Sequence, residues 1–183
     1  MSATVGWGAA SQHFDSILQA NVIMVVGANP TEGHPVFASR LKQRLRQGAR
    51  LIVADPREIG LVRSPHIEAA VHLQLRPGTN VALMNAIAHV IVTEGLTKDA
   101  YVAERCEADS YAKWKLFVSD PGNSPEAMAT ITGVDPGLVR EAARLYGAAP
   151  NGAIYYGLGV TEHSQGTTMV MSIANLEIGR AHV

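Results

Sequence analysis

The chain has 183 residues, of which 47% are hydrophobic and 17% are charged, a composition typical of one globular domain and not of a disordered chain. Its 15 Lys and Arg residues against 16 Asp and Glu residues give a formal net charge of -1, which excludes a broad positive field for nucleic acid or for an anionic membrane. The single cysteine, Cys106, excludes an internal disulfide and a cysteine pair that binds zinc or an iron-sulfur cluster.

No charged segment followed by an apolar run opens the sequence, as a secretory signal would. No apolar run approaches the roughly 18 residues that a membrane-spanning helix needs. We therefore expect a soluble, cytoplasmic protein.

The first half of the chain predicts a strand, a helix and a second strand. The run NVIMVVG at 21–27 is typical of a strand that is covered on both faces of a parallel sheet. Apolar residues then recur every four positions over 36–47, as in a helix, and Gly48 is placed to end it. The apolar segment 51–54 is the second strand. Two buried strands joined through a helix favour a parallel βαβ unit.

The same signals predict the remaining elements. Residues 71–75 alternate between apolar and polar, as in a short strand. The clearest helix starts at a cap on Thr79 or Asn80, and Gly95 lies just past its end. Asp135 caps a further helix. The other predicted elements are helices at 98–105, 110–118 and 166–176, a loop from Ser119 and a strand at 153–156.

Helices that alternate with buried strands predict an α/β fold with a Rossmann-like, open, mostly parallel sheet and helices on both faces. Ligands of such sheets bind beyond the carboxyl ends of the strands. Three predicted strands end in short polar motifs, which are GANPTE from Gly27, DPR from Asp55 and GLGVTE from Gly157. Because these motifs meet at one edge of the sheet, they predict a nucleotide site there.

Each motif residue also has a structural interpretation. Gly27 lets a phosphate approach the backbone, or it is the glycine of a tight turn. Asp55 follows the second strand, where dinucleotide-binding folds place a carboxylate that accepts hydrogen bonds from ribose, or it caps a turn. Arg57 pairs with a phosphate or carboxylate, or it is an exposed arginine beside a proline. The residues alone leave both interpretations open.

The other polar residues predict no catalytic group and no metal site. The basic stretch 42–50 is interpreted as a solvated helix face, because the net charge is near zero and no aromatic residues are interleaved. The histidines lack metal-ligand spacing. His89 is expected to be structural, whereas His34 and His163 lie in strand-end loops and are candidates for contact with a ligand. No nucleophile pairs with a base, and no Gly-x-Ser-x-Gly elbow is present.

Long stretches of the chain closely resemble the catalytic α subunit of molybdenum or tungsten formate dehydrogenases. The resemblance covers 5–176. The segment VGWGAASQHFDSILQAN and the run from Glu162 to Gln165 are most similar to the soluble, NAD-linked branch. The matching stretches are ANVIMVVGANPTEGHPVFASRLKQRLRQGARLIVADPRE, LQLRPGTNVALMNAIAHVIVTEGL, ITGVDPGLVREAARLY and AIYYGLGVTEHSQGT.

The resemblance implies a bis(molybdopterin guanine dinucleotide) cofactor, bis-MGD, with Mo or W, one of whose nucleotide arms lies in a Rossmann-like domain. Where many relatives carry aspartate, this chain has Asn80, whose amide offers one acceptor and a donor in place of a carboxylate. Cys106 does not match the metal-ligand motif. The implied cofactor-binding residues are Gly27, Ala28, Asn29, Glu32, Ala54, Asp55, Pro56, Arg57, Gly78, Asn80, Gly157, Leu158, Gly159 and Glu162.

The resemblance also implies that the catalytic groups lie outside this sequence. The metal ligand, a cysteine or selenocysteine followed by histidine, and the iron-sulfur cysteines are expected upstream, and the active-site arginine downstream. We expect 1–177 to form most of one cofactor-binding domain of a longer subunit. The last six residues, IGRAHV at 178–183, are expected to be a non-native tail, because they match a translated sequencing adapter.

The resulting hypothesis is a parent enzyme that oxidises formate to carbon dioxide and passes electrons through iron-sulfur clusters to NAD. Its expected partners are the remaining domains of the subunit, iron-sulfur and flavin or NAD subunits, and formate, with no nucleic acid and no membrane. Two alternatives stay open. One is another enzyme that uses the same cofactor, such as a nitrate reductase or an NADH dehydrogenase large subunit. The other is a stand-alone nucleotide-binding domain.

Overall fold

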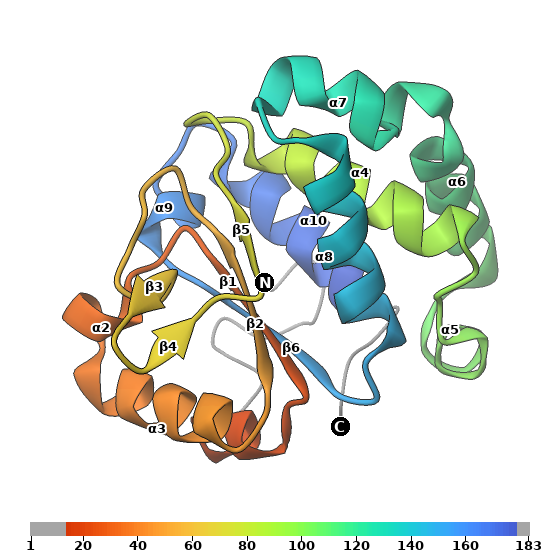
Figure 1. Cartoon of the computed structure of the whole chain (residues 1–183). Coiled ribbons are helices and arrows are strands. Elements are labelled where there is room, and N and C mark those ends of the chain that lie inside the picture. The colour runs from red at the N-terminus through yellow and green to blue at the C-terminus, as the bar shows by residue number, and fades with distance from the viewer. Residues whose placement is uncertain (1–13, 179–183) are drawn as a thin grey trace.

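A computed structural model describes residues 14–178, apart from the side chains of Arg105, Glu177 and Ile178. Helices surround a central sheet and a small hairpin (Figure 1). The helices are η1 (Phe14–Gln19), α2 (Pro30–Gly33), α3 (Pro35–Arg46), α4 (Asn80–Thr93), α5 (Asp99–Arg105), α6 (Ala108–Ser119), η2 (Pro121–Asn123), α7 (Pro125–Thr132), α8 (Pro136–Ala148), α9 (Leu158–Thr161) and α10 (Gly166–Ile178).

Four parallel strands form the central sheet in the order β5-β2-β1-β6. β1, Val22–Val26, pairs with β2, Arg50–Ala54, and with β6, Gly152–Tyr156. β5, Val71–Leu73, pairs with the other side of β2. The predicted α/β fold with a Rossmann-like, mostly parallel sheet is therefore confirmed.

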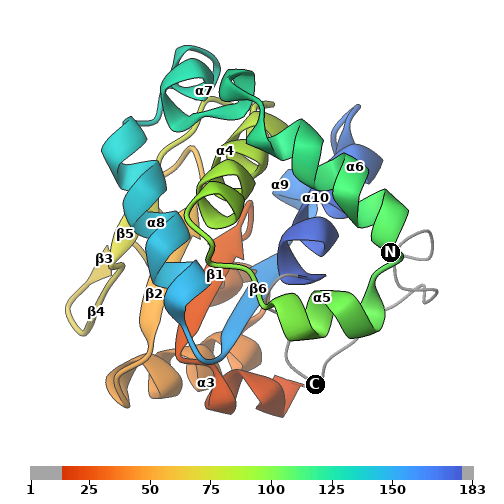
Figure 2. The same cartoon turned by 90° about the vertical axis from the view of Figure 1, so that its right-hand side faces the viewer.

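Helices cover both faces of the sheet, because successive residues of a strand point to opposite faces. Ile23 of β1 packs with Phe37 and Leu41 of α3 on one face. Met24 packs on the other face in a cluster with residues of α4, α8 and α10. Figure 1 shows α3 on one side of the sheet and these three helices on the other, and Figure 2 shows the same layers from the side. All five residues of β1 are buried, which explains its continuous apolar run.

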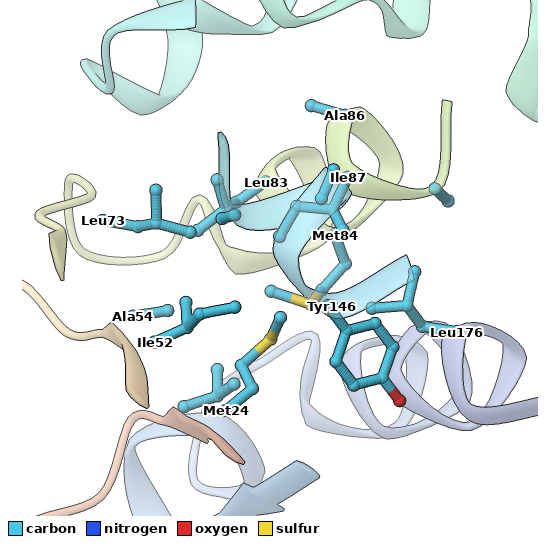
Figure 3. Packing of buried hydrophobic residues seen from close by; sticks show 14 of the residues in the cluster. Met24, Ile52, Ala54, Leu73, Leu83, Met84, Ala86, Ile87, Tyr146 and Leu176 are labelled. Atoms are coloured by element: carbon cyan, nitrogen blue, oxygen red, sulfur yellow. The ribbon is translucent and has the colours of Figure 1, made fainter. Parts of the chain in front are cut away.

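The larger core lies between the sheet and α4 (Figure 3). The ring of Tyr146 from α8 is fully buried in it. Gly152 leaves space for this ring, because a Cβ at that position would lie 2.7 Å from Tyr146 Cε2. His89 Nδ1 of α4 lies 2.8 Å from the carbonyl oxygen of Val118 and joins α4 to α6, so this histidine has the structural role that the sequence predicts.

The structure differs from the sequence expectations in its short elements. No helix is predicted at 125–132, where the structure has α7, capped by the Ser124 hydroxyl that accepts a hydrogen bond from the Ala127 amide at 3.3 Å. A hairpin of β3, Arg63–Ser64, and β4, Ile67–Glu68, which is not predicted either, joins β2 to β5. No helix in the described part of the chain is long and apolar enough to cross a membrane. The expected tail at 178–183 lies outside the described residues, except for the last backbone position of α10.

Candidate functional site

The chain changes direction across the sheet between β1 and β6. From β1 it proceeds to β2 and β5 on one side, and it then crosses to β6 on the other side of β1. Ligands of open α/β sheets bind at such a switch point, beyond the carboxyl ends of the strands. In Figure 1, α2 and α9, which follow β1 and β6, lie on the left at this end of the sheet.

A cavity of about 700 Å³ lies at this end of the sheet. The loops that follow all four strands of the central sheet contribute to its wall. The lining residues are Gly27, Ala28, Asn29, Glu32, Gly33, His34, Asp55, Pro56, Arg57, Pro77, Gly78, Asn80, Gly157, Leu158, Gly159 and His163. The strand-end motifs therefore meet in one place, as the sequence analysis expects.

Gly27 holds the loop after β1 against its neighbours. Its φ of 53° is in the left-handed region that favours glycine. Its amide donates to the carbonyl oxygen of Ala54 at 2.9 Å, and its own carbonyl accepts from the Gly159 amide at 3.0 Å. These contacts support the interpretation of Gly27 as a turn glycine, and a phosphate contact stays a prediction.

Asp55 is a buried carboxylate at the end of β2, with a side chain only 4% exposed. Its Oδ1 accepts from the Arg57 backbone amide at 2.8 Å, and the Arg57 Nε lies 3.4 Å away. The side chain of Arg57 is 71% exposed, so its remaining donors face solvent. Two polar residues from the β5 side hold the loop, because His72 Nε2 lies 3.0 Å from the Asp55 carbonyl and Gln74 Nε2 donates to Pro56 at 3.0 Å.

Asn29 lines the cavity and has a buried side-chain acceptor. Among the described residues, none donates a hydrogen bond to its Oδ1. A buried acceptor without a partner costs free energy, so such a group needs a donor from elsewhere. Guanine offers N–H donors and ribose offers hydroxyls. The unpaired Oδ1 of Asn29, the buried carboxylate of Asp55 and the exposed guanidinium of Arg57 thus fit a guanine dinucleotide.

Two residues that the resemblance implies do not line the cavity. Ala54 is buried in β2 and contributes through its carbonyl to Gly27. Glu162 is exposed at the end of α9. Conversely, Gly33 and Pro77 line the cavity without being predicted. Gly33 follows the predicted Glu32, and Pro77 precedes the predicted Gly78. The histidine candidates His34 and His163 also line it.

Cys106 lies outside this cavity, at the end of α5. It lines a separate cavity of about 300 Å³ with Asp99 and Tyr111. Burial raises the pKa of the Cys106 thiol, which lowers its reactivity. Over residues 14–178, no three His, Cys, Asp or Glu side chains gather as a metal site.

Comparison with known proteins identifies the family. The molybdopterin oxidoreductase family model matches residues 3–181. This chain belongs to the molybdopterin oxidoreductase family. Membership agrees with the predicted enzyme family, and this family implies a molybdopterin-bound metal in the parent enzyme.

This molybdopterin oxidoreductase chain is similar to enzymes of several names. It is 38% identical over 184 residues to formate dehydrogenase H of Escherichia coli K12, covering 98% of this chain and 25% of that protein. It is 31% identical over 185 residues to a nitrate reductase of Symbiobacterium thermophilum, covering 96% and 24%. The solved structure of acetylene hydratase from Pelobacter acetylenicus matches with a TM-score of 0.78 and 26% identity, covering 87% of this chain and 21% of that one. The chain thus spans about a quarter of the length of these relatives.

Proposed function

We propose that this chain holds one guanine dinucleotide arm of a bis-MGD cofactor in a formate dehydrogenase. The observation that carries the proposal is the cavity at the switch point, which Asn29, Asp55 and Arg57 line from the loops after β1 and β2. Membership of the molybdopterin oxidoreductase family supports the identity of the ligand. The higher identity to a formate dehydrogenase, 38%, than to a nitrate reductase, 31%, supports the reaction.

The residues of this chain would bind and orient the cofactor without entering the chemistry. Asn29 would accept a hydrogen bond from a guanine N–H or a ribose hydroxyl, Asp55 would accept from the same groups, and the solvent-facing donors of Arg57 would pair with a phosphate. When bound, the cofactor supplies a redox-active molybdenum or tungsten for the two-electron oxidation of formate to carbon dioxide. None of the described residues is assigned a catalytic role.

The parent enzyme would pass its electrons through iron-sulfur clusters to NAD. Its partners would be the remaining domains of the subunit together with iron-sulfur and flavin or NAD subunits, in the cytoplasm. These features rest on the resemblance of the sequence to the soluble, NAD-linked branch.

A nitrate reductase is the second candidate, because the chain is also 31% identical to one. Assay of the complete subunit that contains this chain with an artificial electron acceptor or donor separates the two, since the first candidate predicts formate oxidation and the second predicts nitrate reduction. Nitrate reduction without formate oxidation would contradict the first proposal.

The cofactor role is tested by the guanine nucleotide that the complete subunit retains after gel filtration, measured as GMP after acid hydrolysis. Asp55→Asn removes the charge but keeps an acceptor, and we expect about a tenfold loss of retained nucleotide. Asp109→Asn is the matched control, because it makes the same chemical change at an exposed residue of α6 that does not line the cavity. Equal nucleotide content in both variants would argue against the proposed site.

A stand-alone nucleotide-binding domain makes a different prediction. Calorimetric titration of the 183-residue chain with guanosine diphosphate would then show tight, saturable binding. We expect weak binding, because the rest of the grip on the cofactor belongs to other parts of the parent enzyme.

A further inference from the structure

Arg76 joins the turn after β5 to the C-terminal end of α7. The last four carbonyl groups of an α-helix have no partner within the helix. In α7 the first of the four accepts from the Gly133 amide, and Arg76 supplies the donors for the others. The partners are Gly133 N to Ala129 O at 2.8 Å, Arg76 Nη1 to Thr130 O at 2.8 Å and to Ile131 O at 3.4 Å, and Arg76 N to Thr132 O at 2.8 Å.

The same residue begins the turn that forms part of the cavity wall. The carbonyl oxygen of Arg76 accepts from the Thr79 amide at 3.2 Å and from the Thr79 hydroxyl at 2.7 Å. Pro77 in the second position and Gly78 in the third, with a φ of 82°, match a type II turn. The Thr79 carbonyl then accepts from Leu83 at 3.1 Å at the start of α4.

Pro77 and Gly78 of this turn line the cavity, as does Asn80 at the start of α4, whereas Arg76 does not. Asn80 is only 9% exposed. The positions of these three residues depend on the position of the turn. The hydrogen bonds from Arg76 to α7 fix the position of the turn. The guanidinium is also favoured there by the negative end of the helix dipole.

We propose that Arg76 is a positioning residue of the cavity, which docks the turn 76–79 onto the end of α7 and thereby sets the wall formed by Pro77, Gly78 and Asn80. What the cavity holds rests on the proposed function. The docking itself does not, and it is measurable in the chain without a ligand.

Gly133 offers an independent way to disturb this contact. It ends α7 with a φ of 75°, and a Cβ there would lie 3.2 Å from Arg76 Nε and 3.4 Å from Arg76 Cγ. The added methyl group of Gly133→Ala therefore crowds the Arg76 side chain and should displace it from the end of α7. Gly95→Ala is its matched control. Gly95 also follows a helix with a positive φ, 67°, but a Cβ there would have no atom within 4 Å.

Hydrogen exchange on the full chain tests the docking. We expect Arg76→Met and Gly133→Ala to speed exchange of the Thr79 and Leu83 amides about tenfold, because these amides close the turn and start α4. Arg76→Lys should restore part of the protection, since an ammonium group still donates to a helix carbonyl. Arg140→Met removes another arginine contact of α7, to Glu126 at 2.8 Å, and should leave these two amides unchanged.

Retained guanine nucleotide in the complete subunit is the second measurement, and Arg76→Met should lower it while Arg140→Met should not. Unchanged exchange at Thr79 and Leu83 would overturn the proposal. An equal rise in the exchange rates of amides in β1 and α8 would also overturn it, because it would indicate a stabilising role only. Faster exchange at Thr79 and Leu83 with full nucleotide content would overturn it as well. A failure of the proposed function gives a different result. In that case Asp55→Asn would retain as much guanine nucleotide as the wild type, while faster exchange at Thr79 and Leu83 in Arg76→Met would still support the docking.

Discussion

Three glycines bring the loops after β1 and β6 into backbone contact. A Cβ on Gly157 would lie 2.9 Å from the Ala28 Cβ, and one on Gly159 would lie 2.7 Å from the Gly27 carbonyl oxygen. One on Gly27 would lie 2.8 Å from the Gly159 carbonyl carbon. Any side chain at these positions has to displace main chain. This side of the cavity therefore depends on residues without side chains.

Gly27 is required for two reasons, its positive φ and the closeness of the Gly159 backbone, and alanine substitutions separate them. Gly48→Ala meets only a φ of 101°, with no atom within 4 Å, and should cost about 1–2 kcal/mol in the free energy of unfolding. Gly27→Ala adds the backbone contact and should cost more. Gly60→Ala meets neither obstacle and should stay within about 0.5 kcal/mol of the wild type. Urea unfolding measures all three, and equal costs for Gly27→Ala and Gly48→Ala would contradict the role of the contact.

At the scale of elements, α8 is attached to its neighbours by two ion pairs. Arg144 donates to both carboxylate oxygens of Glu94, the residue that ends α4, at 2.8 and 2.9 Å. Arg140 donates to Glu126 of α7 at 2.8 Å. The hydrogen bonds from Arg144 hold the pKa of Glu94 below its usual range. A carboxylate with a lowered pKa in the folded state stabilises that state above its unfolded pKa, and the contribution is lost as the pH falls through the folded pKa.

Arg144→Met should therefore lower the melting temperature at pH 7, and the difference from the wild type should vanish once the pH falls below the lowered pKa of Glu94. The same substitution should raise the pKa of Glu94 toward that of a free glutamate, as measured by NMR titration. Lys115→Met on the exposed side of α6 is the control, since the described residues offer Lys115 no ion-pair partner. A pH-independent difference would contradict the pairing.

The whole molecule has a separate hydrophobic cluster on each face of the sheet. Leu41 of α3 is fully buried in one cluster, and Leu83 of α4 is fully buried in the other. β1, β2 and β6 each contribute side chains to both clusters, so the two faces share one backbone. We infer that the clusters form and unfold together.

Leu41→Ala and Leu83→Ala should each cost about 2–5 kcal/mol. Because the sheet separates the two sites, the double variant should lose the sum to within about 0.5 kcal/mol. Calorimetry should show one transition in each variant. A second transition in either single variant would show that one face unfolds without the other.

The apolar pattern and the turn residues are enough to predict β1 and β2 as a parallel unit and β6 as a further strand, because a strand buried on both faces leaves a continuous apolar run. They also predict that Gly27, Asp55 and Gly157 meet, since the carboxyl ends of parallel strands share one edge. The family resemblance then supplied the expected ligand, which geometry alone does not name.

Contacts between segments that are far apart in the chain could not be predicted from the sequence patterns. Arg76 meets Thr130 across 54 positions, and no local pattern relates an arginine after β5 to the free carbonyls of α7. Ala54 contributes through its backbone, and Glu162 is exposed at the end of α9 and does not line the cavity. Local propensity and periodicity are properties of neighbours in the chain. The wall of the cavity depends on how α7, α4 and the loops pack around the sheet, and that packing exists only in the folded molecule.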